Sequence, residues 1–83
     1  MKGKTVLEVG IKKDRTERII KESAKSLHID TDYAYVDLAN KSIKPDRNHS
    51  IQHVKSYDNL EIYGKFDYIV SDLDIEADNI IKL

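Results

Sequence analysis

Four carboxylates stand on alternate residues near the end of the chain. They belong to Asp72, Asp74, Glu76 and Asp78. In an extended backbone alternate side chains share one face, so these acids would lie together and repel one another. A divalent cation relieves such repulsion, and calcium takes about six to eight oxygen ligands, mostly from carboxylates and carbonyls. The row therefore predicts a calcium site built from these four side chains.

The acidic row departs from a complete calcium-binding loop. Its first three acids are spaced like the start of an EF-hand, which also needs glycine at the sixth position and glutamate at the twelfth. Those positions hold Ala77 and Leu83, so the segment is not an EF-hand. Acids from other loops would have to complete the ligand shell. The alternative is an exposed strand with an acidic outer face, which discourages edge-to-edge aggregation.

Hydrophobic periodicity predicts the elements of the first half. Residues 5–11 are apolar and β-branched, which is typical of a strand. Asp14 is placed to cap a helix whose apolar stripe continues to Leu27. A turn is expected over residues 29–32. Residues 40–50 contain the only proline and are expected to form a mobile surface loop.

The second half reads as strands. Residues 33–38 and 51–57 are expected to be strands. Residues 60–63 and 66–70 flank Gly64-Lys65, a pair typical of a type II′ hairpin turn.

One convincing helix can cover only one face of a sheet. Residues 1–83 are therefore expected to form a single small α+β domain. The expected architecture is a two-layer sandwich, with a mixed sheet of about four to five strands, one main helix and a C-terminal hairpin. The alternative is an α/β half-Rossmann fold.

Four segments resemble, in chain order, the motifs of class I S-adenosylmethionine-dependent methyltransferases. They are Val6-Leu7-Glu8-Val9-Gly10, Tyr35-Val36-Asp37-Leu38, Ser56-Tyr57-Asp58 and Phe66-Asp67-Tyr68-Ile69-Val70-Ser71. The resemblance implies a cofactor-binding domain in which Gly10, Asp37 and Asp58 contact S-adenosylmethionine. That family has a glycine-rich turn after its first strand, whereas Gly10 is followed here by five larger residues. In size and acidic loops the chain is also similar to a small archaeal calcium-binding protein.

The composition narrows the functional classes. Lysine and arginine number 14 against 15 aspartates and glutamates, so net charge gives no general attraction for nucleic acid. There is no cysteine, which excludes disulfides and thiolate metal sites and favours a reducing, cytoplasmic setting. The longest apolar run, Tyr68-Ile69-Val70, is far shorter than a membrane span requires. We expect neither a nucleic-acid partner nor a membrane.

Three histidines raise the question of zinc or acid–base chemistry. His28 is expected at the end of the helix, where a cation suits the helix dipole. His49 and His53 are four residues apart, but their segment lacks helical periodicity and no third ligand is indicated. No zinc site and no nucleophile with its base are predicted, so the protein is not expected to be an enzyme.

The sequence therefore favours a non-catalytic domain that binds calcium through its acidic row. One alternative is a degenerate S-adenosylmethionine-binding domain. The other is an interaction module without a ligand, which docks a protein partner through its charge polarity. The polarity is marked, because residues 58–78 hold seven acids and one lysine.

Overall fold

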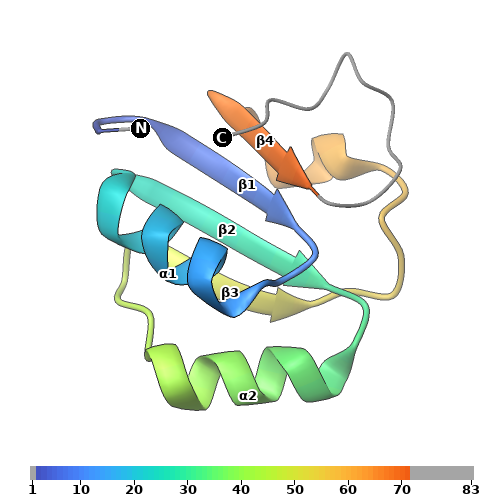
Figure 1. The fold of residues 1–83 in the computed structure, drawn as a ribbon. Helices are drawn as coiled ribbons and strands as arrows, with labels where there is room; N and C mark the ends of the chain where they lie inside the picture. Colours follow the sequence, from blue (N-terminus) through green and yellow to red (C-terminus); the bar gives the residue numbers. More distant parts are fainter. Residues whose placement is uncertain (1, 72–83) are drawn as a thin grey trace.

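The computed structural model describes residues 2–71, in which helices and strands alternate. In chain order the elements are β1 (Thr5–Val9), α1 (Lys13–Glu22), β2 (Lys25–Asp30), α2 (Tyr33–Ile43), β3 (His49–His53), the 3-10 helix η1 (Leu60–Tyr63) and β4 (Tyr68–Ser71). The four strands form one sheet in the order β3-β2-β1-β4 (Figure 1). A small fold of helices and strands is thus confirmed. Within the described residues, however, every strand pair is parallel instead of mixed.

The central strand β1 is buried on both faces, as expected of a strand with parallel neighbours on each side. Val6 and Glu8 face the helices, where Val6 packs on Ile19 of α1. Leu7 and Val9 face the opposite side. The prediction of a strand here is confirmed, because β-branched and apolar residues suit a strand that is covered on both sides.

The two helices cover one face of the sheet. The chain passes from β1 to β2 to β3 in one direction across the sheet, and right-handed crossovers then put α1 and α2 on the same side. The opposite face is covered by the long connection from β3 to β4. Its buried contacts to Leu7, Val9 and Ile29 come from Val54, Tyr57, Leu60, Tyr63 and Phe66.

The helix predicted to continue to Leu27 ends earlier. Ser23 caps α1, and its hydroxyl donates to the Ile19 carbonyl at 2.6 Å. Leu27 lies instead in β2, which pairs with β1. The turn expected over residues 29–32 begins after Asp30, because β2 continues to that residue. Although the apolar residues up to Leu27 have helical spacing, pairing with β1 makes the segment from Lys25 a strand.

The predicted strand over residues 33–38 is wrong, because this segment starts α2. Asp32 caps the helix: one carboxylate oxygen accepts from the backbone N–H groups of Ala34 and Tyr35, at 3.0 and 3.4 Å. Val36 and Ala39 face the core, at helical spacing. The helix ends at Ile43, and its C-cap Lys44 lies in the left-handed region at φ 53°, directly before Pro45. Residues 40–43 of the expected loop are therefore helical. The described residues contain two α-helices, whereas one main helix was expected.

The predicted C-terminal hairpin is also wrong. Its first strand is instead η1, which follows Asn59 in the left-handed region and ends at Gly64, where φ is 97°. Its second strand is β4, but β4 pairs in parallel with β1. A hairpin needs two adjacent antiparallel strands. Residues 60–63 are not a strand, and Gly64 ends the helical turn η1 instead. The strand expected over residues 51–57 is shifted to His49–His53.

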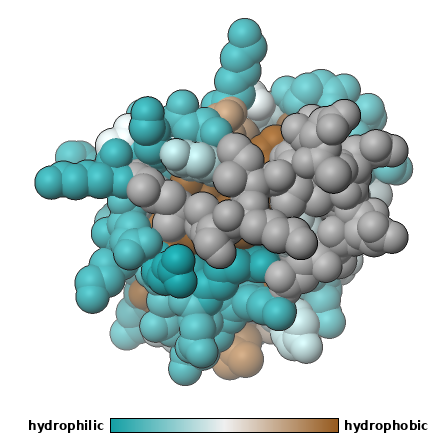
Figure 2. Space-filling model, turned by 45° about the horizontal axis from the view of Figure 1, so that its top comes forward, coloured by the Kyte–Doolittle hydropathy of each residue, from teal (hydrophilic) through white to brown (hydrophobic). Residues whose placement is uncertain are grey.

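Hydrophilic side chains dominate one face of the molecule. On the face drawn in Figure 2, hydrophilic residues cover most of the coloured area and hydrophobic residues show only in patches between them. Neither helix of the described residues has the length and apolar character needed to cross a membrane.

Candidate functional site

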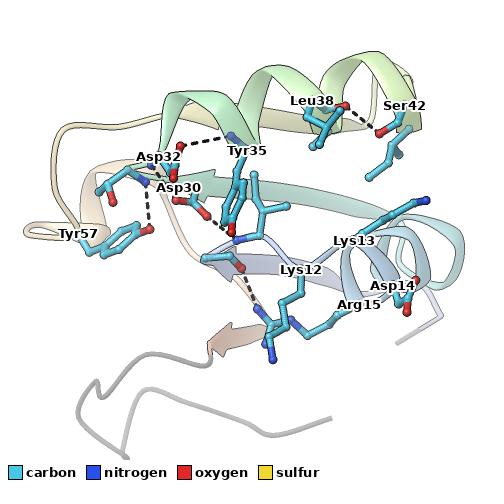
Figure 3. Close-up of a pocket in the computed structure, with 15 residues that line it drawn as sticks. Lys12, Lys13, Asp14, Arg15, Asp30, Asp32, Tyr35, Leu38, Ser42 and Tyr57 are labelled. Atoms are coloured by element: carbon cyan, nitrogen blue, oxygen red, sulfur yellow. Dashed lines mark hydrogen bonds between the residues drawn. The ribbon is translucent and has the colours of Figure 1, made fainter.

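A groove of about 970 Å³ opens at the carboxyl edge of the sheet (Figure 3). One wall is α2, the other is formed by the first residues of α1, and the turn from β1 into α1 lies between them. Its volume falls within the range of roughly 300–1,000 Å³ typical of small-molecule sites. Below, this space is called the α1–α2 groove.

The floor of the groove is the turn after β1, which hydrogen bonds fix on three sides. Gly10 has φ 89°, a conformation that glycine adopts without strain, and its N–H donates to the Ile29 carbonyl at 2.8 Å. The N–H of Ile11 donates to the Asp30 carboxylate at 2.8 Å. Arg15 donates from Nη2 to the Gly10 carbonyl at 2.7 Å. The turn is therefore positioned before any ligand arrives.

Two acids follow β2 at the same edge, and both organise backbone. Asp30 is buried, and its second oxygen accepts from the N–H of Asp32 at 2.8 Å. Asp32 caps α2, as described above. The Tyr57 hydroxyl accepts from the N–H of Thr31 at 3.1 Å and so ties the β3–β4 connection to this edge. These contacts rigidify the mouth of the groove.

The α2 wall of the groove is apolar but reaches solvent. Tyr35 and Leu38 line it and are 57% and 64% exposed, although both are large hydrophobic residues. Ala39 and Ile43 lie deeper on the same wall, and Ile11 packs against the cluster from the β1–α1 turn. Exposed apolar residues that gather in one concave place mark a binding surface more often than scattered ones do.

A chain of hydrogen-bonded polar side chains lies under the helices. We call it the buried relay, and its members in order are Arg15, Glu8, His28, Ser26 and His49. Glu8 accepts from Arg15 Nε at 2.7 Å and bonds His28 Nδ1 at 2.7 Å. Ser26 Oγ lies 2.6 Å from His28 Nε2 and 2.6 Å from His49 Nδ1. Thr16 adds a further donor to Glu8, at 2.5 Å.

Burial of the relay is nearly complete. Glu8 and His28 are 0% exposed, and every fully buried side-chain nitrogen or oxygen of the described residues has a hydrogen-bond partner. Burial lowers the pKa of His49, and the nearby charge of Asp46 opposes that shift. A satisfied polar network of this kind is permitted in a core, whereas a partly satisfied one would be costly.

The residues predicted to bind a cofactor do not come together. Gly10 lies in the floor of the groove. Asp37 was expected at a strand end, but it lies on the middle of α2 and pairs with Lys41 at 2.9 Å. Asp58 is exposed on the β3–β4 connection. The acid that ends β2 is Asp30.

The predicted calcium ligands Asp72, Asp74, Glu76 and Asp78 lie outside the described residues, and calcium binding stays a prediction. Within residues 2–71 no group of three or more histidine, aspartate or glutamate side chains is arranged to hold a metal ion. Of the three histidines, His28 lies within β2 instead of at a helix end.

Sequence reasoning missed the relay and the α2 wall. The available signal for the relay was Glu8, a lone carboxylate within an apolar strand, which implies buried donors nearby. The signal for the wall was Asp32 followed by apolar residues at helical spacing.

Comparison with protein-family models, curated proteins and solved structures gives no match for this chain.

Proposed function

We propose that the protein binds a small molecule containing a nucleoside in the α1–α2 groove, without converting it chemically. The observation that carries the proposal is the position of this groove at the carboxyl edge of a parallel sheet. Ligands of open α/β sheets bind outside the carboxyl ends of the strands, where the strand order reverses. Here the chain moves outward from β1 to β3 and then returns to β4 on the other side of β1, so the reversal lies at β1.

The polar groups at the groove fit this proposal. The floor begins at Gly10, directly after β1, and Asp30 stands at the end of the neighbouring strand. Both oxygens of Asp30 already accept from backbone N–H groups, but each carboxylate oxygen has a further acceptor site. Ribose hydroxyls can use those acceptor sites. Asp30, instead of Asp37, is therefore the proposed sugar-binding acid.

The apolar wall supplies the second part of the site. The exposed ring of Tyr35 offers a planar surface beside the turn after β1 (Figure 3). Stacking of a base on an aromatic ring contributes about 1–3 kcal/mol. A nucleoside would thus place its base against Tyr35 and its ribose toward Asp30. The resemblance of Val6–Gly10 and Phe66–Ser71, which contain β1 and β4, to methyltransferase motifs makes S-adenosylmethionine the first ligand to test.

Amide NMR titration of the labelled protein tests the proposal, with S-adenosylmethionine, adenosine triphosphate and adenosine as ligands. Saturable shifts at Gly10, Thr31 and Tyr35 are expected for at least one of them. Replacing Tyr35 by alanine should weaken that binding about tenfold. Tyr33→Ala is the matched control, because Tyr33 lies on the same helix, is 66% exposed and does not line the groove.

Two outcomes would overturn the proposal. The first is the absence of groove shifts with all three ligands at millimolar concentration. The second is an equal loss of affinity in Tyr35→Ala and Tyr33→Ala, which would show that the ligand does not bind in the groove.

A further inference from the structure

The buried relay has only one consistent set of hydrogen-bond directions when Glu8 is ionised and His28 is neutral. Glu8 then accepts from Arg15, Thr16 and His28 Nδ1, so the proton of His28 is on Nδ1. His28 Nε2 must therefore accept, and the donor is the Ser26 hydroxyl. Ser26 in turn accepts from His49 Nδ1. Both histidines are thus fixed as Nδ1–H tautomers.

One end of this chain reaches solvent. His49 is 6% exposed, and its Nδ1 is bonded to Ser26. Nε2 makes no hydrogen bond to the described residues. Every fully buried side-chain nitrogen or oxygen of these residues has a partner, so Nε2 is not fully buried and contacts solvent. In the Nδ1–H tautomer Nε2 carries a lone pair. A proton from water can therefore enter the relay at His49 Nε2.

We propose that the buried relay is a pH-responsive device that transmits a proton from His49 to His28 and thereby loosens the hold of Arg15 on the β1–α1 turn. Protonated His49 gives its Nδ1 proton to Ser26, and Ser26 gives its own hydroxyl proton to His28 Nε2. The Ser26 hydroxyl ends reversed, donating to His49 Nδ1. His49 is then neutral with its proton on Nε2, and His28 is positively charged, so one proton has moved inward and no other group has changed its charge.

The charges around His28 explain why Arg15 responds. On β1 the neighbouring group is Glu8, and on α1 it is Arg15, which pairs with the same carboxylate. From β3 the titratable neighbour is His49, with Asp46 beside it. The core contacts of α2 are made by apolar side chains. A charged His28 therefore shares one carboxylate with Arg15 in a region of low dielectric, and the two cations repel.

Arg15 can yield to that repulsion because its side chain is 19% exposed, whereas Glu8 and His28 have no exposure. Its Nη2 contact with the Gly10 carbonyl holds the floor of the α1–α2 groove. Proton entry at His49 is thus relayed across two strands to the groove. If a ligand binds in the groove, its affinity should then depend on pH. Only this consequence rests on the proposed function.

The test uses the ligand-free protein, so it succeeds or fails independently of the proposed function. Imidazole ¹⁵N spectra at pH 8 should show Nδ1–H tautomers for both His28 and His49. Between about pH 8 and pH 5.5, the Arg15 Nε–H signal and the Gly10 carbonyl carbon should shift with the same midpoint as an imidazole of the relay. A different tautomer of His28 in the parent protein would overturn the hydrogen-bond directions assigned to the relay, and with them the proposal.

Two variants complete the test. His49→Asn keeps a donor near the Nδ1 position but cannot be protonated, so the shifts of Arg15 and Gly10 should be lost. His53→Asn is the matched control on the same strand, since His53 is exposed and lies outside the relay, and it should keep the shifts. Shifts in His49→Asn equal to those of the parent would overturn the proposal. So would parent signals that do not move over this pH range, a readout that needs no variant to fold.

Discussion

A carboxylate without solvent contact is stable in a protein interior only when donors surround it. The Glu8 carboxylate accepts hydrogen bonds from Arg15, Thr16 and His28, and the residue has no exposed surface. A neutral amide could accept part of these bonds but would remove the negative charge that pairs with Arg15 Nε. Replacing Glu8 by glutamine should therefore lower the free energy of unfolding by about 3 kcal/mol, as removal of one partner of a buried ion pair does.

Chemical denaturation at pH 7 measures this loss. The matched control is Glu17→Gln, because Glu17 is exposed on α1 and its change should stay within about 0.5 kcal/mol. A Glu8 variant as stable as that control would show that the carboxylate is not what holds Arg15.

Calcium binding makes a separate prediction at the residue scale. If Asp72 and Asp74 repel one another and share a cation, their replacement by asparagine should abolish calcium-induced shifts and leave stability without calcium unchanged or higher. An amide NMR titration with calcium, repeated with magnesium, measures this. Parent-like calcium affinity in the double variant would contradict the assignment.

At the scale of the element, the end of α2 contains backbone strain. Lys44 adopts φ 53° as the C-cap, a conformation that costs a non-glycine residue roughly 1–2 kcal/mol. Lys44→Gly should relieve this strain and raise the free energy of unfolding by up to about 1 kcal/mol, the remainder being offset by the greater entropy of the unfolded chain.

Asn59→Gly is the matched control for this prediction. Asn59 also has positive φ, at 58°, but asparagine tolerates the left-handed region, so its gain should be smaller. Thermal unfolding of both variants measures the difference. An equal gain would show that strain at Lys44 is not the cause.

The start of β4 is joined to β1 by a carboxylate whose pKa is lowered. Asp67 accepts from the Thr5 N–H at 2.8 Å and from its hydroxyl at 3.1 Å, and these bonds favour the ionised form. Because the folded pKa lies below the unfolded one, the stabilisation is present above about pH 4 and is lost as the pH falls through the folded pKa.

Denaturation midpoints measured from pH 6 to pH 2 test this linkage. Asp67→Asn should be less stable than the parent at pH 6, and the gap should narrow toward pH 2. Asp58→Asn, on the same connection and exposed, should show no such narrowing. If the difference in stability between Asp67→Asn and the parent stayed constant from pH 6 to pH 2, the lost stability would come from altered hydrogen-bond geometry instead of the lost charge.

At the scale of the whole molecule, local patterns predicted the strands that are central or strongly β-branched. The segments now known as β1 and β4 were found from their own residues, because Val6, Val9 and Val70 suit strands in any setting. The expectation of strand for Tyr33–Leu38 failed for a different reason. Alternating tyrosines resemble a strand, and only the cap at Asp32 and the burial of Val36 and Ala39 distinguish a helix.

The groove was beyond the reach of sequence because three separate segments build it. Gly10 was singled out as a cofactor contact from the resemblance, and the structure places it in the groove floor. Asp30 and Tyr35 acquire their positions only when β2 pairs with β1 and α2 folds back over the sheet. The same applies to the relay, in which His28 and His49 meet through β2–β3 pairing. Contacts between strands distant in sequence leave no local pattern.

The strand order also predicts how stability is distributed. β1 pairs with β2 and β4 and is covered on both faces, whereas β3 is an edge strand. Amides of Leu7, Glu8 and Val9 should therefore exchange only through global unfolding, while those of Gln52 and His53 should also exchange through smaller openings. Native-state hydrogen exchange at increasing low denaturant measures both free energies of opening. If β3 amides matched the denaturant dependence of β1, the sheet would open as one unit, and the central strand would hold no more stability than its edge.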